Sequence, residues 1–327
     1  MISPKLVMTD KSGVQFTVPD ECFFLGYRGS VAHGMYVPPE NPDSIDDIDL
    51  MGFCIGSEMD YFGLGEWGSR GTKEIKTGQY DVVLYEARKA VSLLLQGNPN
   101  IMSMLWLEGR HRLIVDPIAE ELLRHRHCFV GKHVYNAFAG YAHQQMEKME
   151  SRDPDELREY LAVTAELKFR GAHPNHKGET FPEPERDTGE LRDIANWDID
   201  KLLARLRHYQ KKGENIGYMG EKRKQLVLRH SYDTKNAAHL IRLLRMCVEF
   251  MKTGEMQVHR QDAAELLDIK TGKWALADVK LLAEDLWSLA RAARDASTLP
   301  DEPDREGAEK MLVRMVRDGL KLGTPRP

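Results

Sequence analysis

The sequence predicts an α+β protein in which a small mixed β-sheet comes first and a larger set of helices follows. In the first part of the chain, short apolar runs of strand length alternate with clusters of Gly, Pro and Asp. From about residue 116 onward, the apolar residues recur at helical spacing almost without interruption. At 327 residues the chain is long enough for two domains. The change of pattern predicts a first domain at residues 1–125 and a mainly helical domain at residues 126–327.

The composition argues against several classes of protein. With 46 Lys and Arg against 51 Asp and Glu, the net charge is −5, so a protein that coats duplex nucleic acid is not expected. A local basic groove can still bind nucleic acid at any total charge. No apolar run approaches the roughly 20 residues that span a bilayer, and the N-terminus lacks the apolar core of a signal peptide, so we expect no membrane segment. The four cysteines show no paired spacing, which favours a cytoplasmic location.

The elements of the first domain follow from local patterns. Apolar runs predict strands at residues 22–29, 47–55 and 79–85, an edge strand at 14–18, and two further pieces of the same layer at 101–107 and 112–115. Gly29-Ser30 ends the first of these strands and begins a tight turn into a short helix. Residues 86–96 have helical spacing, and Gly97-Asn98-Pro99 ends that helix, with Asn98 capping the break.

The second domain is expected to consist of helices joined by loops. The apolar spacing predicts helices at residues 117–126, 131–150, 154–170, 198–212, 231–252, 261–269, 277–296 and 304–321. Between two of them lies an unusually long segment, residues 171–193, which is rich in Pro, Glu, Gly and His. Such a segment is typical either of a lid over a binding site or of a disordered loop.

Two aspartates in the second strand are the first candidates for chemistry. Asp47 and Asp49 are two residues apart, so their side chains share one face of a strand. Adjacent carboxylates repel each other, and their hard oxygen atoms suit Mg²⁺. Asp81 adds a carboxylate on the third strand, which completes the layout of a two-metal phosphoryl-transfer centre. The alternative is that the pair lies on an exposed edge strand and that Asp81 forms a salt bridge.

Gly29-Ser30 is the second candidate. A turn of this composition lets backbone N–H groups and a hydroxyl approach a triphosphate. Ser30 has an alternative role as the N-cap of the short helix, which is compatible with phosphate binding.

Two other clusters are interpreted as ordinary surface. His125-Arg126-His127-Cys128 contains side chains that can bind metal, but its compact spacing matches no common zinc template. Lys222-Arg223-Lys224 could steer an acidic substrate, and we favour an ordinary charged surface.

The first two candidates resemble a known family. Gly29-Ser30 followed by Asp47-Ile48-Asp49 is similar to the signature of the DNA polymerase β-type nucleotidyltransferase superfamily. More narrowly, four stretches resemble the predicted nucleotidyltransferases found beside RNA ligases, the RlaP-type family; they are residues 29–34, 47–52, 95–100 and 232–244. Two features depart from the pattern. The gap between Ser30 and Asp47 is longer than usual, and His33 stands where a tyrosine is commoner, which would alter its contact with the nucleotide.

The resemblance implies a fold, an activity and a set of residues. The fold is a polymerase-β-like catalytic domain and a helical domain that closes over the nucleotide. The activity is transfer of an NMP from an NTP, ATP among them, to an acceptor hydroxyl with release of pyrophosphate. Two Mg²⁺ ions, or Mn²⁺ as a substitute, are the implied cofactors. The implied functional set is Gly29, Ser30, Asp47, Asp49 and Asp81.

The resemblance leaves the acceptor open. An RNA 3′ end, in repair or end-tailing, is suggested by the association with ligases. A protein hydroxyl or a small molecule would use the same centre. A non-catalytic nucleotide sensor or partner protein with this fold is the alternative class of function.

The helix predicted at residues 231–252 carries a polar stripe. At about 100° per residue, this stripe contains Tyr232, Lys235, His239, Arg242 and Met246, and the opposite side is apolar and expected in the core. A stripe of this kind is usually a solvated surface. In the implied fold it faces the triphosphate, with Lys235 and His239 as phosphate contacts and Tyr232 as a stacking or sugar contact.

Overall fold

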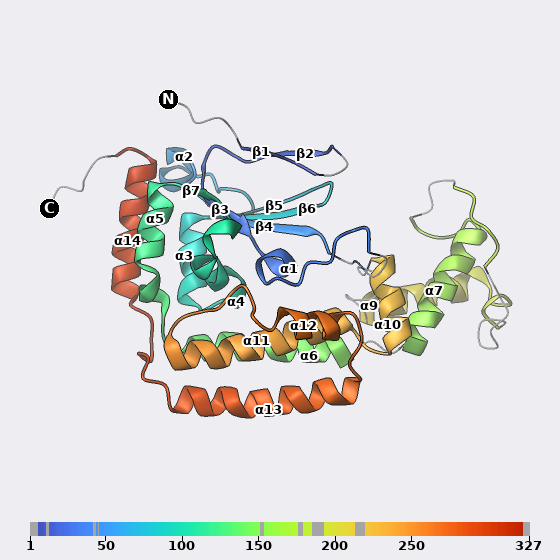
Figure 1. Ribbon diagram of the computed structural model, residues 1–327. Coiled ribbons are helices and arrows are strands. Elements are labelled where there is room, and N and C mark those ends of the chain that lie inside the picture. Colours follow the sequence, from blue (N-terminus) through green and yellow to red (C-terminus); the bar gives the residue numbers. More distant parts are fainter. Residues whose placement is uncertain are drawn as a thin grey trace.

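The structure of the chain is a computed structural model that describes residues 6–10, 13–41, 44, 46–150, 154–175, 179–184, 193–212 and 220–322. It confirms the predicted fold class, since a small mixed sheet in the first part of the chain is followed by helices (Figure 1). None of the helices within these ranges combines the length and the apolar character that crossing a membrane requires.

The central sheet has five strands in the order β5-β6-β4-β3-β7. They are β3 (Cys22–Tyr27), β4 (Ile48–Cys54), β5 (Thr72–Thr77), β6 (Tyr80–Glu86) and β7 (Arg112–Val115). Strands β4 and β6 are parallel, and the other neighbouring pairs are antiparallel. Four of these strands were predicted, with slightly different ends. Strand β5 escapes prediction because it is an edge strand whose only large apolar residue is Ile75.

The two faces of the sheet have different partners. One face packs against a two-stranded ribbon made of β1 (Val7–Thr9) and β2 (Gln15–Thr17). The buried residues on that face are Leu25, Leu50, Val82 and Leu84. Met51 belongs to the opposite face and joins the main hydrophobic core, which includes the helices. Because side chains alternate along a strand, Asp49 shares the face of Met51 and is directed toward the helices.

The helices of the main body lie mostly beneath and beside the sheet (Figure 1). The α-helices are α1 (Gly29–Ala32), α2 (Glu58–Phe62), α3 (Ala87–Leu95), α4 (Pro99–Met102), α5 (Pro117–Arg124), α6 (Val134–Glu150), α11 (Thr234–Thr253), α12 (Ala263–Lys270), α13 (Leu276–Asp295) and α14 (Arg305–Gly319). Short 3₁₀ helices span Ser103–Trp106 (η1), Gly109–His111 (η2) and Arg126–Phe129 (η3). Helix α11 is central, because it packs against α6, α12 and α13 and most of its residues are buried.

One hydrophobic core extends across the predicted domain boundary. It includes Phe24 and Met51 from the sheet, Phe250 from α11 and Met315 from α14. The boundary at residue 125 falls between α5 and η3. The division into two domains therefore stays a prediction, while the continuous core fixes α11 relative to the sheet.

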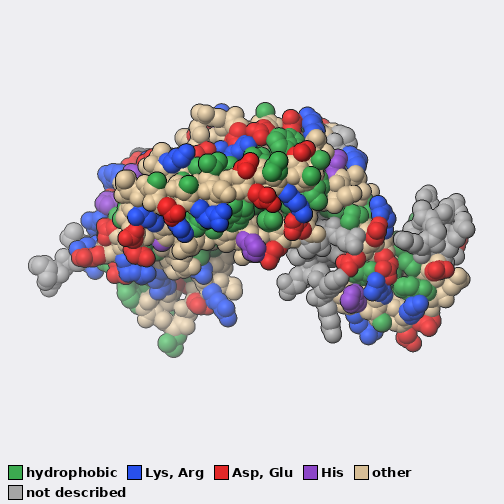
Figure 2. Space-filling view, turned by 90° about the horizontal axis from the view of Figure 1, so that it is seen from below, with side chains coloured by type: hydrophobic (Ala, Val, Ile, Leu, Met, Phe, Trp, Pro, Cys, Tyr) green, Lys and Arg blue, Asp and Glu red, His purple; other side chains and the backbone are tan. Residues whose placement is uncertain are grey.

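A smaller lobe stands to one side of the main body (Figures 1 and 2). It contains α7 (Pro154–Phe169), α9 (Ile199–Lys212) and α10 (Glu221–His230). The lobe has a separate core, formed by residues such as Leu157, Val163, Leu202, Leu206 and Val227. Within the long segment predicted as a lid or loop, residues 176–178 and 185–192 lie outside the described residues.

Candidate functional site

Asp49 and Asp81 lie next to each other on the face of the sheet directed toward the helices. They are Cα partners on the parallel strands β4 and β6, and their side chains are 26% and 24% exposed. The Arg28 Nη2 atom lies 3.7 Å from the Asp49 Oδ1 atom and 3.9 Å from the Asp81 Oδ1 atom. Lys76 Nζ lies 3.5 Å from Asp81 Oδ2. The structure thus brings together two of the three predicted carboxylates and adds Arg28, which sequence reasoning did not single out.

The pKa of Asp49 depends on its burial and on four charged neighbours. Burial raises the pKa of Asp49, Arg28 and Lys235 oppose that increase, and the neighbouring Asp81 and Asp47 carboxylates raise it further. Carboxylates whose charge is disfavoured by burial and by other carboxylates gain from a bound cation. The hard oxygen donors of this group match the preference of Mg²⁺.

Asp47 is placed differently from the prediction. Strand β4 begins at Ile48, so Asp47 lies just before it and is exposed. Asp46 is the buried neighbour, which accepts hydrogen bonds from the Val37 N–H (2.9 Å) and from Lys270 Nζ. We refer to Asp47, Asp49 and Asp81 as the acidic edge. Its three carboxylates do not bring their ligand atoms within 4.8 Å of one another.

Gly29 fits tightly against the acidic edge. Its φ angle is +59°, in the left-handed region, and a Cβ atom there would lie only 2.1 Å from the Asp49 Oδ2 atom. Glycine is therefore required for both conformation and space. Ser30 is buried inside α1, whose N-cap residue is Arg28, so the alternative that Ser30 caps this helix is wrong.

The start of α11 is anchored close to the acidic edge. Its N-cap residue Asp233 is fully buried and accepts a hydrogen bond from the Asn236 N–H. Asp233 also forms a salt bridge with Arg223, in which the Arg223 Nη2 atom lies 2.9 Å from the Asp233 Oδ2 atom. The interpretation of residues 222–224 as ordinary surface is therefore wrong for Arg223, and it is also wrong for Lys224, which is buried. Lys235 follows in the first turn of α11, and its Nζ atom lies 3.9 Å from the Asp46 Oδ1 atom. The charge of Lys235 also acts to lower the pKa of Asp49.

The stripe on α11 is not a solvated surface. Tyr232, Arg242 and Met246 are buried, because α6, α12 and α13 surround this helix. The Tyr232 hydroxyl donates to the Trp274 carbonyl at 2.7 Å. This internal hydrogen bond indicates a structural role for Tyr232 instead of the expected stacking.

His33 is also used internally. It is buried, and its Nδ1 atom lies 2.8 Å from the Val258 carbonyl oxygen. Burial, reinforced by the nearby Arg242, lowers the pKa of His33 well below its usual value. A neutral, buried His33 ties the turn after α1 to the loop that follows α11, which is not the nucleotide contact expected from the sequence.

His239 lies on the same stripe of α11 as the positively charged Lys235 and Arg242. Burial lowers the pKa of His239 well below its usual value, and Arg242, Lys235, Lys270 and Arg223 lower it further. We refer to Lys235, His239 and Arg242 as the cationic face of α11.

Arg242 is the most constrained member of this face. It is 6% exposed, and burial followed by the charge of Arg260 lowers its pKa to about 9. Its Nη1 atom contacts the Met246 sulfur at 3.3 Å, and its Nε atom has no hydrogen-bond partner among the described residues. Sequence reasoning placed Arg242 on the stripe without assigning it a role.

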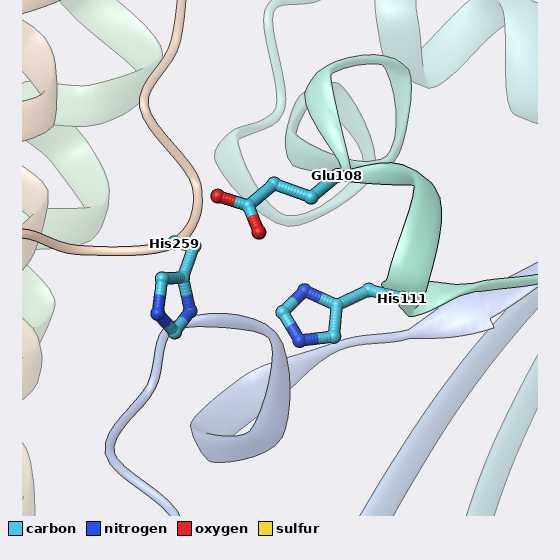
Figure 3. A group of neighbouring side chains, drawn as sticks. All are labelled: Glu108, His111 and His259. Carbon is cyan, nitrogen blue, oxygen red and sulfur yellow. The ribbon is translucent and has the colours of Figure 1, made fainter.

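A second group of potential ligands was missed by sequence reasoning. Glu108, His111 and His259 bring one ligand atom each within 4.8 Å of one another (Figure 3). Burial lowers the pKa of His111, and the charges of Arg110 and His259 act in the same direction. No sequence spacing could indicate this group, because His259 is distant in the chain and follows α11. By contrast, the cluster at His125–Cys128 forms no such group among the described residues.

Comparison with known proteins identifies the family. A family model described as "RlaP: RNA repair pathway DNA polymerase beta family" matches residues 14–213. This range contains Gly29-Ser30 and the acidic edge, and it ends before α11. No curated protein and no solved structure matches the chain. Because the matched range covers more than half of the sequence, the chain belongs to the RlaP family, the RNA repair pathway DNA polymerase beta family.

Proposed function

We propose that the protein is a Mg²⁺-dependent nucleotidyltransferase that moves an NMP from an NTP to an acceptor hydroxyl and releases pyrophosphate. The observation that carries this proposal is the pairing of Asp49 with Asp81 on adjacent parallel strands, directly against the Gly29 turn. The membership of the chain in a polymerase β family supports it.

The roles of the acidic edge follow from its chemistry. Asp47, Asp49 and Asp81 would hold two Mg²⁺ ions, or Mn²⁺ in their place, which would neutralise phosphate charge and lower the pKa of the attacking hydroxyl. Gly29 allows the backbone to approach the phosphates, and Ser30 follows it in the same turn. Arg28 keeps Asp49 and Asp81 oriented by lying within 4 Å of both.

The cationic face of α11 is the proposed phosphate-binding side. Lys235 lies in the first turn of the helix, beside the acidic edge, and His239 is one turn further along. A buried guanidinium without a carboxylate partner is unfavourable unless an anion compensates it. We therefore add Arg242 to Lys235 and His239 as a contact to the triphosphate, since guanidinium groups bind phosphate through paired N–H donors.

The proposed acceptor is an RNA 3′ end. The support is the description of the family, which places it in RNA repair. Figure 2 shows positive and negative side chains intermixed over the helical face of the described residues, without a broad basic area for duplex binding. Such a face is more compatible with a local contact to the end of a strand than with coating of a duplex.

A nucleotide sensor is the second candidate. It is favoured by one observation: the three carboxylates of the acidic edge do not converge within 4.8 Å. A sensor would bind NTP without releasing pyrophosphate, so the two candidates differ in a measurable product.

The proposal is tested by the double variant Asp47→Ala with Asp49→Ala. We expect pyrophosphate release to fall by at least roughly 1,000-fold, because several kcal/mol of transition-state stabilisation depend on the metal ligands. Asp285→Ala, on the exposed side of α13, is the matched control and should keep the wild-type rate. Transfer at the wild-type rate by the double variant would show that the site is wrongly assigned.

The acceptor is identified with α-phosphate-labelled NTPs and a cell extract. Label in RNA supports the proposed acceptor, and label in protein or in small molecules replaces it. Calorimetric binding of NTP by the wild-type protein, with no label in any fraction, would favour the sensor.

We also propose a cytoplasmic location. All four cysteines are free thiols, although Cys22 and Cys54 lie opposite each other on β3 and β4. Few cysteines in a chain of this length, without a disulfide among them, are typical of a protein in a reducing compartment.

A further inference from the structure

A second group of side chains lies beside the turn that follows α1. Glu108 is the N-cap residue of η2, His111 is its last residue, and His259 lies in the loop between α11 and α12. One ligand atom of each side chain lies within 4.8 Å of the other two. Figure 3 shows that the three side chains approach one another from separate segments. We propose that Glu108, His111 and His259 bind a divalent transition metal ion of the Zn²⁺ type.

Both imidazole rings have a nitrogen that the protein leaves without a partner. The Nδ1 atoms of His111 and His259 are buried, and neither has a hydrogen-bond partner among the described residues. Burying a polar atom without a partner carries a free-energy cost. The ring centroids are 5.5 Å apart and the planes are inclined at 47°, so the rings are not stacked face to face. A metal ion would compensate unpaired nitrogen atoms on both rings at once.

The protein holds His259 in place from several sides. A Cβ atom on Gly34 would lie 2.6 Å from the His259 Cε1 atom, so only glycine leaves room for the ring. His33 fixes both neighbours of His259: its Nδ1 lies 2.8 Å from the Val258 carbonyl oxygen, and its own carbonyl accepts from the Arg260 N–H at 3.3 Å. A ligand on an anchored loop loses little freedom on binding a metal ion.

Glu108 and His111 are supported in a similar way. The Arg110 Nε atom lies 2.7 Å from the Glu108 Oε2 atom. A carboxylate has two oxygens, so this contact orients the group and leaves the other oxygen for a metal ion. The His111 ring has an edge-on contact with Tyr27, at a centroid distance of 6.4 Å.

The donor set selects the kind of metal. Imidazole nitrogen suits Zn²⁺ and its neighbours in the first transition row, whereas Mg²⁺ prefers oxygen ligands. Two histidines and one carboxylate also leave a coordination position open for water at a Zn²⁺ ion. This preference separates the site chemically from the acidic edge. A bound ion would connect η2 with the loop before α12 and thereby brace the turn after α1.

The test uses the full chain, freed of metal with a chelator and titrated with Co²⁺ and then Zn²⁺. Asp47→Asn with Asp49→Asn serves as the background, so that the acidic edge does not contribute. We expect one equivalent of Co²⁺ with the visible absorption of a low-symmetry site, and its displacement by Zn²⁺. His259→Ala and His111→Ala should weaken binding by more than the roughly 10- to 100-fold that a change in a supporting residue costs. Glu108→Gln keeps the shape of the side chain and should weaken binding less.

His143→Ala is the matched control. His143 is exposed on α6, and its Nε2 atom lies 3.4 Å from the Glu147 Oε1 atom, so this variant removes a histidine beside a carboxylate outside the proposed site. It should bind Co²⁺ like the background protein. Thermal unfolding in chelator shows whether each variant still folds, which separates loss of metal binding from loss of fold. If His111→Ala does not fold, the Co²⁺ binding of His259→Ala tests the proposal. Absence of Co²⁺ binding in the background protein, or unchanged binding in His259→Ala, overturns the proposal. Neither result depends on nucleotide transfer.

Discussion

The acidic edge and the cationic face of α11 compensate their charges in different ways. On the acidic edge, Arg28 lies within 4 Å of both Asp49 and Asp81, so the fold itself supplies part of the opposite charge. On the cationic face, Arg242 is buried, and the charge of the nearby Arg260 lowers the pKa of Arg242 further. Burial raises the pKa of Asp49 and lowers the pKa of Arg242, so burial disfavours the charged form of both groups.

This difference indicates what kind of ligand suits the two regions together. A carboxylate group with a raised pKa gains from a cation, and an uncompensated guanidinium gains from an anion. A nucleotide triphosphate with its metal ions supplies both. Substitutions on the acidic edge should therefore act on the rate of transfer, and those on the cationic face should act on nucleotide affinity.

The largest effect is expected from Gly29→Ala on the acidic edge. The new Cβ atom would meet the Asp49 Oδ2 atom at 2.1 Å, in a backbone conformation with φ at +59°. Moving Asp49 by about 1 Å should lower the transfer rate by roughly 100-fold, and the left-handed conformation should cost about 1–2 kcal/mol of stability. Pyrophosphate release and urea unfolding measure the two quantities.

Gly140→Ala is the control for that substitution. Gly140 lies within α6, and a Cβ atom there would meet nothing within 4 Å. The variant should keep the wild-type rate and gain about 0.5–1 kcal/mol of stability. A Gly29→Ala protein that transfers nucleotide as fast as wild type would contradict the close packing of Gly29 against Asp49.

A smaller effect of a different kind is expected from Arg242→Met. A charge-assisted hydrogen bond contributes about 1.5–3 kcal/mol, so NTP affinity should fall by roughly 10- to 100-fold. The free energy of unfolding without NTP should stay the same or increase, because a buried and uncompensated charge is removed. Calorimetric titration and chemical unfolding of the same preparations measure both.

Arg260→Met provides the contrast, since Arg260 is an equally buried arginine with partners. Its Nη1 atom lies 2.6 Å from Glu249 Oε2, and its Nε atom lies 2.8 Å from Asp262 Oδ1. Removing it should destabilise the protein, by less than the roughly 3–5 kcal/mol of a fully buried pair, because both carboxylates are partly exposed. If Arg242→Met destabilises the protein as much as Arg260→Met and leaves NTP affinity unchanged, Arg242 is a structural residue.

The acidic edge could be predicted from the sequence for a physical reason. A strand has a repeat of two residues, so the face of Asp49 follows from its neighbours Ile48 and Leu50 alone. The pairing of Asp49 with Asp81 needs only that two apolar runs lie side by side in one sheet. Asp47 was placed one residue too far inside the strand, because strand ends depend on hydrogen bonds that the sequence does not show.

The cationic face could be predicted only in part. The helical repeat put Lys235, His239 and Arg242 on one stripe, but whether that stripe meets solvent depends on how α6, α12 and α13 pack against α11, which a local pattern does not show. The same limit applies to Tyr232 and His33, whose partners Trp274 and Val258 belong to other segments. Local patterns fix which residues share a face, and tertiary packing decides what that face contacts.

The smallest effect is expected from the pH dependence of His239. Its pKa in the folded protein is well below 6.5, because it is buried among Arg242, Lys235, Lys270 and Arg223. Above the pKa of the unfolded chain, near 6.5, His239 is neutral in both states and has no effect. As the pH falls below that value the unfolded state takes up the proton first, so stability falls by at most about 1.4 kcal/mol per pH unit. Thermal unfolding between pH 7.5 and 5 should therefore show a smaller decrease in His239→Gln than in wild type. The exposed His143→Gln should follow wild type, and identical pH profiles for all three proteins would contradict the lowered pKa of His239.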